Sequence, residues 1–161
     1  MKHLKTSVML ACLVAVVGLA SQGVLAQTKP SANPRVGKWT LDVAKSTYEQ
    51  GKAPASETRT FLATDDGGLQ MIANAVLPSG TKQPSGYRAK YDGKDQPYSG
   101  TAGDTIAITG DNWAWDSTIK MKGKVTQTTH GTISKDGQTM TLVAKTGAGN
   151  AVSTRVYHKV K

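Results

Sequence analysis

Beyond about residue 35, the chain alternates between short stretches rich in Thr, Val, Ile and Tyr and clusters of Gly, Asp, Asn and Ser. This alternation is typical of an all-β protein. Glycine is frequent, and no stretch keeps apolar residues at helical spacing for three turns, so we expect very little helix. The pattern predicts ten strands, near residues 36–42, 56–64, 68–77, 84–91, 95–99, 104–109, 113–122, 124–134, 138–146 and 151–159.

Short turns separate the predicted strands. Asp66-Gly67, Asp92-Gly93 and Asp136-Gly137 supply the positive φ that tight hairpins require. Strands joined by hairpins run antiparallel, and a row of them can close into an up-and-down barrel that leaves no exposed edge. We therefore predict a single antiparallel barrel of about 8–10 strands, with an open β-sandwich as the alternative.

Period-two alternation assigns side chains to the two faces of the later strands. The predicted inner faces comprise Trp113, Trp115, Ser117, Ile119 and Met121, then Val125, Gln127, Thr129, Gly131 and Ile133, then Met140, Leu142 and Ala144. Polar residues interrupt these faces at Ser117, Gln127 and Thr129. Such residues are either satisfied hydroxyl and amide groups in a packed core or the lining of a ligand cavity.

Two aromatic pairs lie at even spacing, two and four residues apart, and so share a face of their strands. Trp113 and Trp115 form one pair, and Tyr87 and Tyr91 flank Ala89 in the other. Each pair can be a ligand platform, but a core anchor is the commoner role in a chain with so few aromatic residues.

The N-terminal segment has the three parts of a secretory signal peptide. Lys2 and Lys5 precede an apolar run over residues 8–20, and small residues before Gln27 form a cleavage site. We therefore expect residues 1–26 to be removed, 27–35 to form a flexible leader, and 36–161 to form the barrel domain of a periplasmic or secreted protein. The only cysteine, Cys12, lies in the removed segment, so the exported chain can form no disulfide.

The basic balance favours an anionic partner. The formal charge of the whole chain is +9, and it falls to +7 once Lys2 and Lys5 are removed. Lipid headgroups, acidic polysaccharides and fatty carboxylates are candidates, whereas nucleic acid is not an expected partner of an exported protein. Lys120, Lys122 and Lys124 share one side of a strand or hairpin end, where they either protect a strand edge or meet an anionic surface.

The sequence carries no recognisable catalytic constellation. It lacks a Gly-x-Ser-x-Gly elbow, a phosphate-binding glycine loop, a His-Glu-x-x-His motif and paired cysteines. His130 and His158 lie on different strands, and most acidic residues adjoin turns, which explains them without a site. We predict a protein that is not an enzyme and needs no cofactor or metal.

The two end strands carry a resemblance. Gly37-Lys38-Trp39 in the first strand and Arg155-Val156-Tyr157 in the last resemble the ends of the barrel in the calycin superfamily, which comprises lipocalins and fatty-acid-binding proteins. The resemblance implies that Gly37 lets the chain bend at the barrel floor and that Trp39 plugs it. It gives Arg155 two mutually exclusive roles, either covering Trp39 as part of the barrel closure or pointing inward with Tyr157 to hold a ligand carboxylate.

The resemblance has limits in this chain. Residues 44–57 carry Gly51 and Pro54 and predict an irregular loop in place of the helical lid of fatty-acid-binding proteins, and the lipocalin disulfide is missing. Residues 37–48 also resemble the opening of a group of small exported bacterial proteins. We expect a binding protein for a small hydrophobic or amphipathic ligand, acidic or neutral, held by Arg155, Tyr157, Trp113, Trp115, Gln127 and Thr129. The alternative is a cell-envelope module that binds anionic surfaces without an internal ligand.

Overall fold

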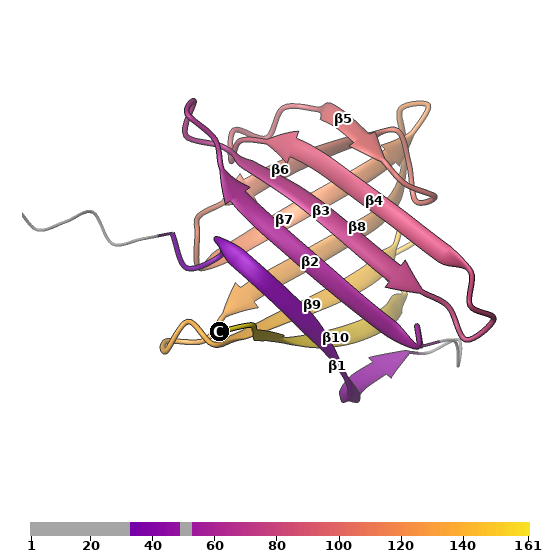
Figure 1. Cartoon of the computed structure of the whole chain (residues 1–161). Coiled ribbons are helices and arrows are strands. Elements are labelled where there is room, and N and C mark those ends of the chain that lie inside the picture. Colours follow the sequence, from indigo (N-terminus) through magenta and orange to yellow (C-terminus); the bar gives the residue numbers. More distant parts are fainter. Residues whose placement is uncertain (1–32, 49–52) are drawn as a thin grey trace, which may run out of the picture. The chain divides into compact units, whose positions relative to one another are not determined.

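Ten antiparallel strands form one closed barrel (Figure 1). The computed structural model describes residues 33–48 and 53–161. The strands are β1 (Gly37–Tyr48), β2 (Ser56–Ala63), β3 (Leu69–Val76), β4 (Lys82–Ala89), β5 (Gln96–Ser99), β6 (Thr105–Gly110), β7 (Ala114–Met121), β8 (Lys124–Ile133), β9 (Thr139–Thr146) and β10 (Ala151–Lys159). Each strand pairs with its neighbours in sequence, and β1 pairs with β10 to close the wall. The predicted barrel is confirmed, and the open sandwich is excluded.

The first strand is longer than the sequence predicted. It extends through Tyr48, so the first part of the expected irregular loop is strand, while residues 49–52 lie outside the described part of the chain. A register shift between Asp42 and Thr47 interrupts its pairing with β10. The Ser46 hydroxyl fills the gap, because it donates to the Asp42 carbonyl at 2.7 Å and accepts from the Val156 amide at 3.0 Å. This bulge breaks the period-two pattern and concealed the strand.

Because consecutive strands are antiparallel, their connections gather at two ends of the barrel. We call the end where β1 begins and β10 finishes the floor, and the opposite end the mouth. At the mouth, Lys122 and Gly123 join β7 to β8 with φ of 50° and 78°. Two successive positive φ values define the tight turn whose twist matches paired strands.

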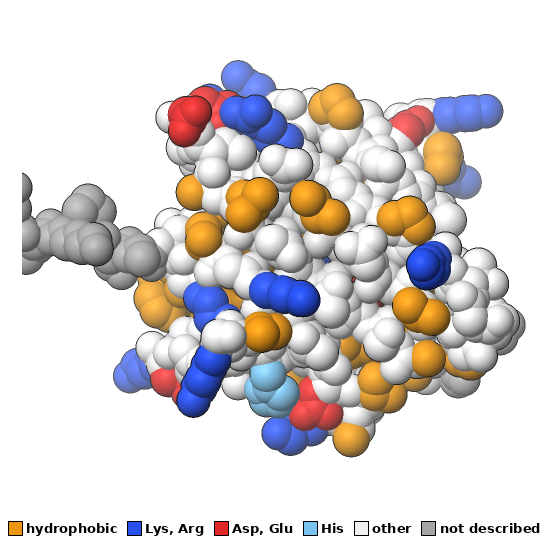
Figure 2. Space-filling view, in the orientation of Figure 1, with side chains coloured by type: hydrophobic (Ala, Val, Ile, Leu, Met, Phe, Trp, Pro, Cys, Tyr) orange, Lys and Arg blue, Asp and Glu red, His pale blue; other side chains and the backbone are white. Residues whose placement is uncertain are grey.

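A layer of buried side chains fills the floor half of the barrel. Trp39, Met140 and Tyr157 are fully buried, and Phe61, Leu69, Ile108 and Trp115 are at most 3% exposed. The outer face is mixed: Figure 2 shows isolated apolar side chains separated by polar ones, with basic groups distributed among them. None of the described residues forms a helix that could cross a membrane.

The N-terminal boundary of the fold differs from the prediction. Residues 1–26, where the signal peptide was predicted, lie outside the described residues, as do residues 27–32 of the expected leader. Asn33–Arg35, the last part of that leader, belong to the barrel floor. The Asn33 side chain donates to Asn112 at 2.8 Å, and Lys159 Nζ donates to the Pro34 carbonyl at 2.8 Å. These contacts bring Arg35 under the barrel, where its side chain is 1% exposed.

Candidate functional site

The barrel encloses a cavity of about 280 Å³. Its lining runs from Phe61 and Trp115 in the floor half to Tyr48, Leu77 and Thr101 at the mouth. That volume is just below the range of about 300–1,000 Å³ that is usual for ligand pockets, and it corresponds to roughly nine water molecules at about 30 Å³ each. The barrel is therefore hollow toward the mouth and packed at the floor.

The floor is closed by Trp39 and Lys159. The Trp39 indole N–H donates to the Arg35 carbonyl at 2.9 Å, and Lys159 Nζ lies 5.2 Å from the centre of the Trp39 ring. Burial lowers the pKa of Lys159. Gly37 has φ 128°, and a Cβ there would approach Lys159 Cε at 3.0 Å, so this position favours glycine.

Arg155 does not cover Trp39. It lines the cavity, so the barrel-closing role that the resemblance offered is wrong, and Lys159 occupies that place. The reason is register: Trp39 pairs with Lys159, whereas Arg155 lies four residues further toward the mouth on β10.

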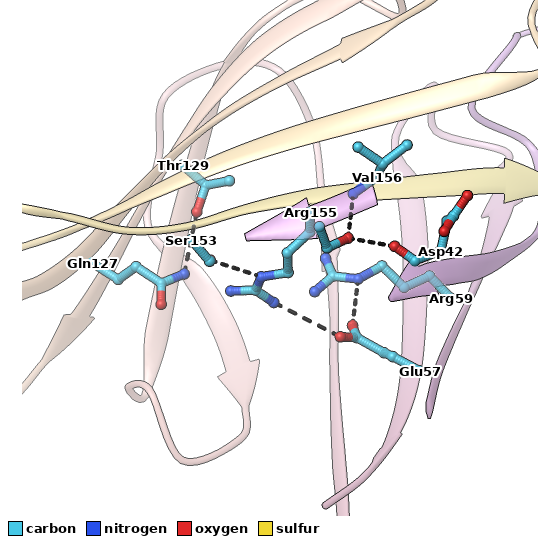
Figure 3. Close-up of polar contacts among 9 residues, drawn as sticks. Asp42, Glu57, Arg59, Gln127, Thr129, Ser153, Arg155 and Val156 are labelled. Atoms are coloured by element: carbon cyan, nitrogen blue, oxygen red, sulfur yellow. Dashed lines mark hydrogen bonds and ion pairs between the residues drawn. The ribbon is translucent and has the colours of Figure 1, made fainter. Parts of the chain in front are cut away.

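A buried ion cluster forms one wall of the cavity (Figure 3). Glu57, 4% exposed, accepts from Arg59 Nε at 2.7 Å and lies 3.8 Å from Arg155 Nη1. Arg155 Nε also donates to the Ser153 hydroxyl at 3.1 Å. Burial raises the pKa of Glu57, but the charges of Arg59 and Arg155 outweigh it and hold that pKa below its usual value. The cluster carries two positive charges and one negative charge.

Arg35 brings a third guanidinium to the cavity, at its inner end. Its Cζ lies 3.6 Å from the centre of the Trp115 ring and 4.8 Å from that of Phe61. Its two Nη atoms donate to the hydroxyls of Tyr91 at 2.9 Å and Tyr87 at 3.1 Å. The Arg35 Nε atom is buried and has no hydrogen-bond partner among the described residues. No carboxylate in that part of the chain lies within 4.0 Å of Arg35.

Neutral polar groups line another part of the cavity wall. Gln127 Nε2 donates to the Thr129 hydroxyl at 3.1 Å (Figure 3). Both residues line the cavity together with Ser117. The polar interruptions in the predicted inner faces therefore line a cavity. This was one of the two interpretations that the sequence allowed, the other being satisfied polar groups in a packed core.

The two tryptophans of the predicted platform are separated. Trp115 is 3% exposed and lines the cavity, whereas Trp113 precedes β7 and is 42% exposed. Trp113 belongs to the turn, where its amide donates to Asp111 Oδ1 at 2.7 Å. Met121 and Val125, also assigned to the inner face, are exposed. The register shift between Ile119 and Lys120 sets Val125 opposite Lys120 instead of an inward-facing residue, and Met121 is the last residue of β7, at the turn.

Tyr157 does not reach the cavity. It is fully buried behind the ion cluster, with the Arg59 guanidinium 5.2 Å from its ring centre. Burial raises the pKa of its hydroxyl, which lies near Glu57 without a well-aligned hydrogen bond. The Arg155 and Tyr157 side chains both face inward, but only Arg155 lines the cavity. The expectation that Arg155 and Tyr157 together contact one ligand is therefore wrong.

The lysine cluster is divided at the mouth. Lys120 pairs with Asp95 at 2.8 Å, Lys122 occupies the turn, and Lys124 begins β8. His130 is exposed and contacts Asp116 at 2.8 Å, as its predicted outward position implies. Within residues 33–48 and 53–161, no three His, Cys, Asp or Glu side chains gather in the manner of a metal site.

Sequence reasoning missed Arg35, Glu57 and Arg59. Glu57, Arg59 and Phe61 alternate along β2, so two charges share the inner face with an aromatic core residue. That arrangement is a usable signal of a polar cavity, because an inward charge is rare without a partner or a ligand. No comparable local signal marks Arg35, whose burial depends on contacts with distant segments.

Comparisons with known proteins give the fold. No protein-family model and no curated protein matches the sequence. Solved structures of the fluorescent protein UnaG are similar in shape. One single-substitution mutant matches with a TM-score of 0.55 and 14% identity over 81% of this chain and 99% of that one. The wild type matches with a TM-score of 0.50 and 12% identity, over 78% of this chain and 96% of that one. A second mutant matches with a TM-score of 0.52 and 13% identity, over 78% of this chain and 95% of that one. The chain thus has a calycin-like fold, a closed barrel of ten antiparallel strands.

Proposed function

We propose that this protein is an exported, non-enzymatic binding protein that holds a small amphipathic acid inside its barrel. One observation carries the proposal: among the described residues, the cavity wall sets Arg35, Arg59 and Arg155 against a single carboxylate, Glu57. Charges enclosed by protein interact more strongly than charges in water, so an uncompensated positive excess favours an anionic guest.

The remaining lining indicates the rest of the ligand. Phe61, Ile106, Ile119 and Leu142 offer apolar contact, while Gln127 and Thr129 offer hydrogen bonds. A guest with an acid group and a short apolar body complements this surface. Arg155, Gln127, Thr129 and Trp115 remain proposed ligand contacts because they line the cavity. Trp113 and Tyr157 do not line the cavity and are no longer proposed as contacts. The envelope-binding alternative receives no support from geometry, since Lys120 already pairs with Asp95.

Native mass spectrometry and displacement of a fluorescent fatty acid test the proposal on the purified mature chain. We expect either a co-purifying acid or saturable displacement by octanoate at one molecule per chain. Absence of both a bound species and displacement would exclude the ligand-binding role. N-terminal analysis of the protein recovered from the periplasm or medium tests export, and a chain beginning at Gln27 is the expected result.

A further inference from the structure

We propose that Arg35, rather than Arg155 of the closing strand, binds the acid group of the ligand, so that the ligand enters with its acid end toward the floor. This inference rests on the proposed function and assigns the charged end of the ligand to one place in the cavity. The place is the pocket formed by Arg35, Tyr87 and Trp115.

The first argument is charge compensation. Arg59 and Arg155 share the carboxylate of Glu57, at 2.7 and 3.8 Å. Arg35 is more deeply buried than either and contacts no carboxylate among the described residues. An isolated charge in the protein interior is costly, and a guanidinium keeps its proton there. The aromatic rings around Arg35 offset part of the cost of burying its charge through cation–π contact, and a bound anion would offset the remainder.

The second argument is unused hydrogen-bonding capacity. A guanidinium has five N–H groups, and Arg35 makes two side-chain hydrogen bonds, to Tyr91 and Tyr87. Its Nε–H is buried without a partner in the described part of the chain. Nε–H and a neighbouring Nη–H form the fork that binds a carboxylate in bidentate fashion.

The third argument is the orientation of the neighbouring phenol. The Tyr87 oxygen accepts a hydrogen bond from Arg35, so its own proton is free to donate to another group. Tyr87 lines the cavity beside Arg35. A carboxylate bound to the Arg35 guanidinium can therefore receive a further hydrogen bond from Tyr87.

The fourth argument is rigidity. The Arg35 amide donates to the Asn33 side chain at 3.0 Å, and the Arg35 carbonyl accepts from Trp39 at 2.9 Å. Asn33 is itself bonded to Asn112 in the β6–β7 turn. The backbone at Arg35 is thus fixed from both sides, and stacking on Trp115 holds the guanidinium plane. A preorganised site binds its ligand with little loss of conformational entropy.

The test measures binding of octanoate and 1-octanol by calorimetry to the mature chain and to the variants Arg35→Gln, Arg35→Lys and Arg155→Gln. The neutral alcohol separates the acid contact from the fit of the apolar body. In Arg35→Gln we expect octanoate affinity to fall about 30-fold or more, because one partner of a buried charge pair is removed. Octanol affinity should stay within about threefold of that of the unsubstituted protein. Arg35→Lys should recover only part of the loss. Arg155→Gln removes another positive charge from the cavity wall and should lower the octanoate-to-octanol affinity ratio severalfold less than Arg35→Gln does.

A second measurement leaves Arg35 in place, in case its substitution unfolds the floor. Bromine quenches tryptophan fluorescence at short range, and Trp115 lies against Arg35. In a Trp113→Phe background, 2-bromooctanoate should quench more strongly at saturation than 8-bromooctanoate.

Each outcome is decisive. Stronger quenching by 8-bromooctanoate, or loss of octanoate selectivity in Arg155→Gln but not in Arg35→Gln, would overturn the assignment to Arg35 while leaving the ligand-binding role intact. Failure of the unsubstituted protein to bind either octanoate or octanol would instead overturn the proposed function, and this inference with it.

Discussion

Replacing Glu57 by Gln tests the ion cluster that shapes the cavity. At an effective dielectric constant of about 20, the carboxylate attracts Arg59 at 2.7 Å by about 6 kcal/mol and Arg155 at 3.8 Å by about 4 kcal/mol. The cost of taking Glu57 out of water offsets much of this attraction. Removing one partner of a buried pair costs about 3–5 kcal/mol. We expect about 3 kcal/mol, the lower limit, because the side chains of Arg59 and Arg155 remain 16% and 19% exposed.

Urea unfolding followed by tryptophan fluorescence measures the effect. A loss of about 3 kcal/mol lowers the unfolding midpoint by about 1.5 M at an m value of about 2 kcal/mol per molar. Asp95→Asn is the matched control, since it makes the same change in an exposed pair with Lys120 and should cost less than about 1 kcal/mol. A Glu57→Gln midpoint equal to that of Asp95→Asn would refute the reasoning.

The same variant has a defined pH dependence. The pKa of Glu57 in the folded protein lies below its usual value of 4.5. Its stabilising contribution is therefore fully present above about pH 4.5 and is lost as pH falls through the lowered pKa. The difference in unfolding free energy between the unsubstituted protein and Glu57→Gln should narrow on acidification below that pH. A difference that widened there would contradict the assigned charge state.

Three further predictions follow from individual side chains. Gly131→Ala should lower the free energy of unfolding by about 1–3 kcal/mol in urea titrations, because its Cβ would overlap the Trp115 indole; an unchanged midpoint would show that the ring moves freely. Trp113→Phe should change octanoate affinity less than twofold and stability by less than about 0.5 kcal/mol, since this residue is exposed; a large loss of affinity would return Trp113 to the site. Burial raises the pKa of Tyr48 to about 12. Tyr48→Phe should therefore remove a late step from the tyrosinate absorbance titration and reduce the loss of folding stability between pH 10 and 12. An unaltered titration would contradict this.

The sequence was sufficient to predict the strands of the barrel but not all the side chains that line its interior. Alternation and turn chemistry located all ten strands, because each depends on neighbours in the chain. Predictions went wrong where a bulge interrupts the alternation: Val125 pairs with Lys120 and is exposed, and the second half of β1 was taken for a loop.

The candidate site shows the same division. Gln127 and Thr129 were found because they interrupt an inner face of a predicted strand. Arg35 was not, because it lies before the first strand in a polar, proline-containing segment. Its burial depends on Asn112 and Lys159, far along the chain, and on the closure of the barrel above it. Contacts of that range carry no local pattern from which they could be inferred.

A crystal structure of the mature protein grown with 8-bromooctanoate tests the central claim most directly, because the bromine position is visible by anomalous scattering. The account predicts one bromine site within the barrel, in the mouth half near Leu77 and Ala102, with the carboxylate on Arg35. Bromine bound only on the outer surface, with the cavity holding solvent alone, would contradict it.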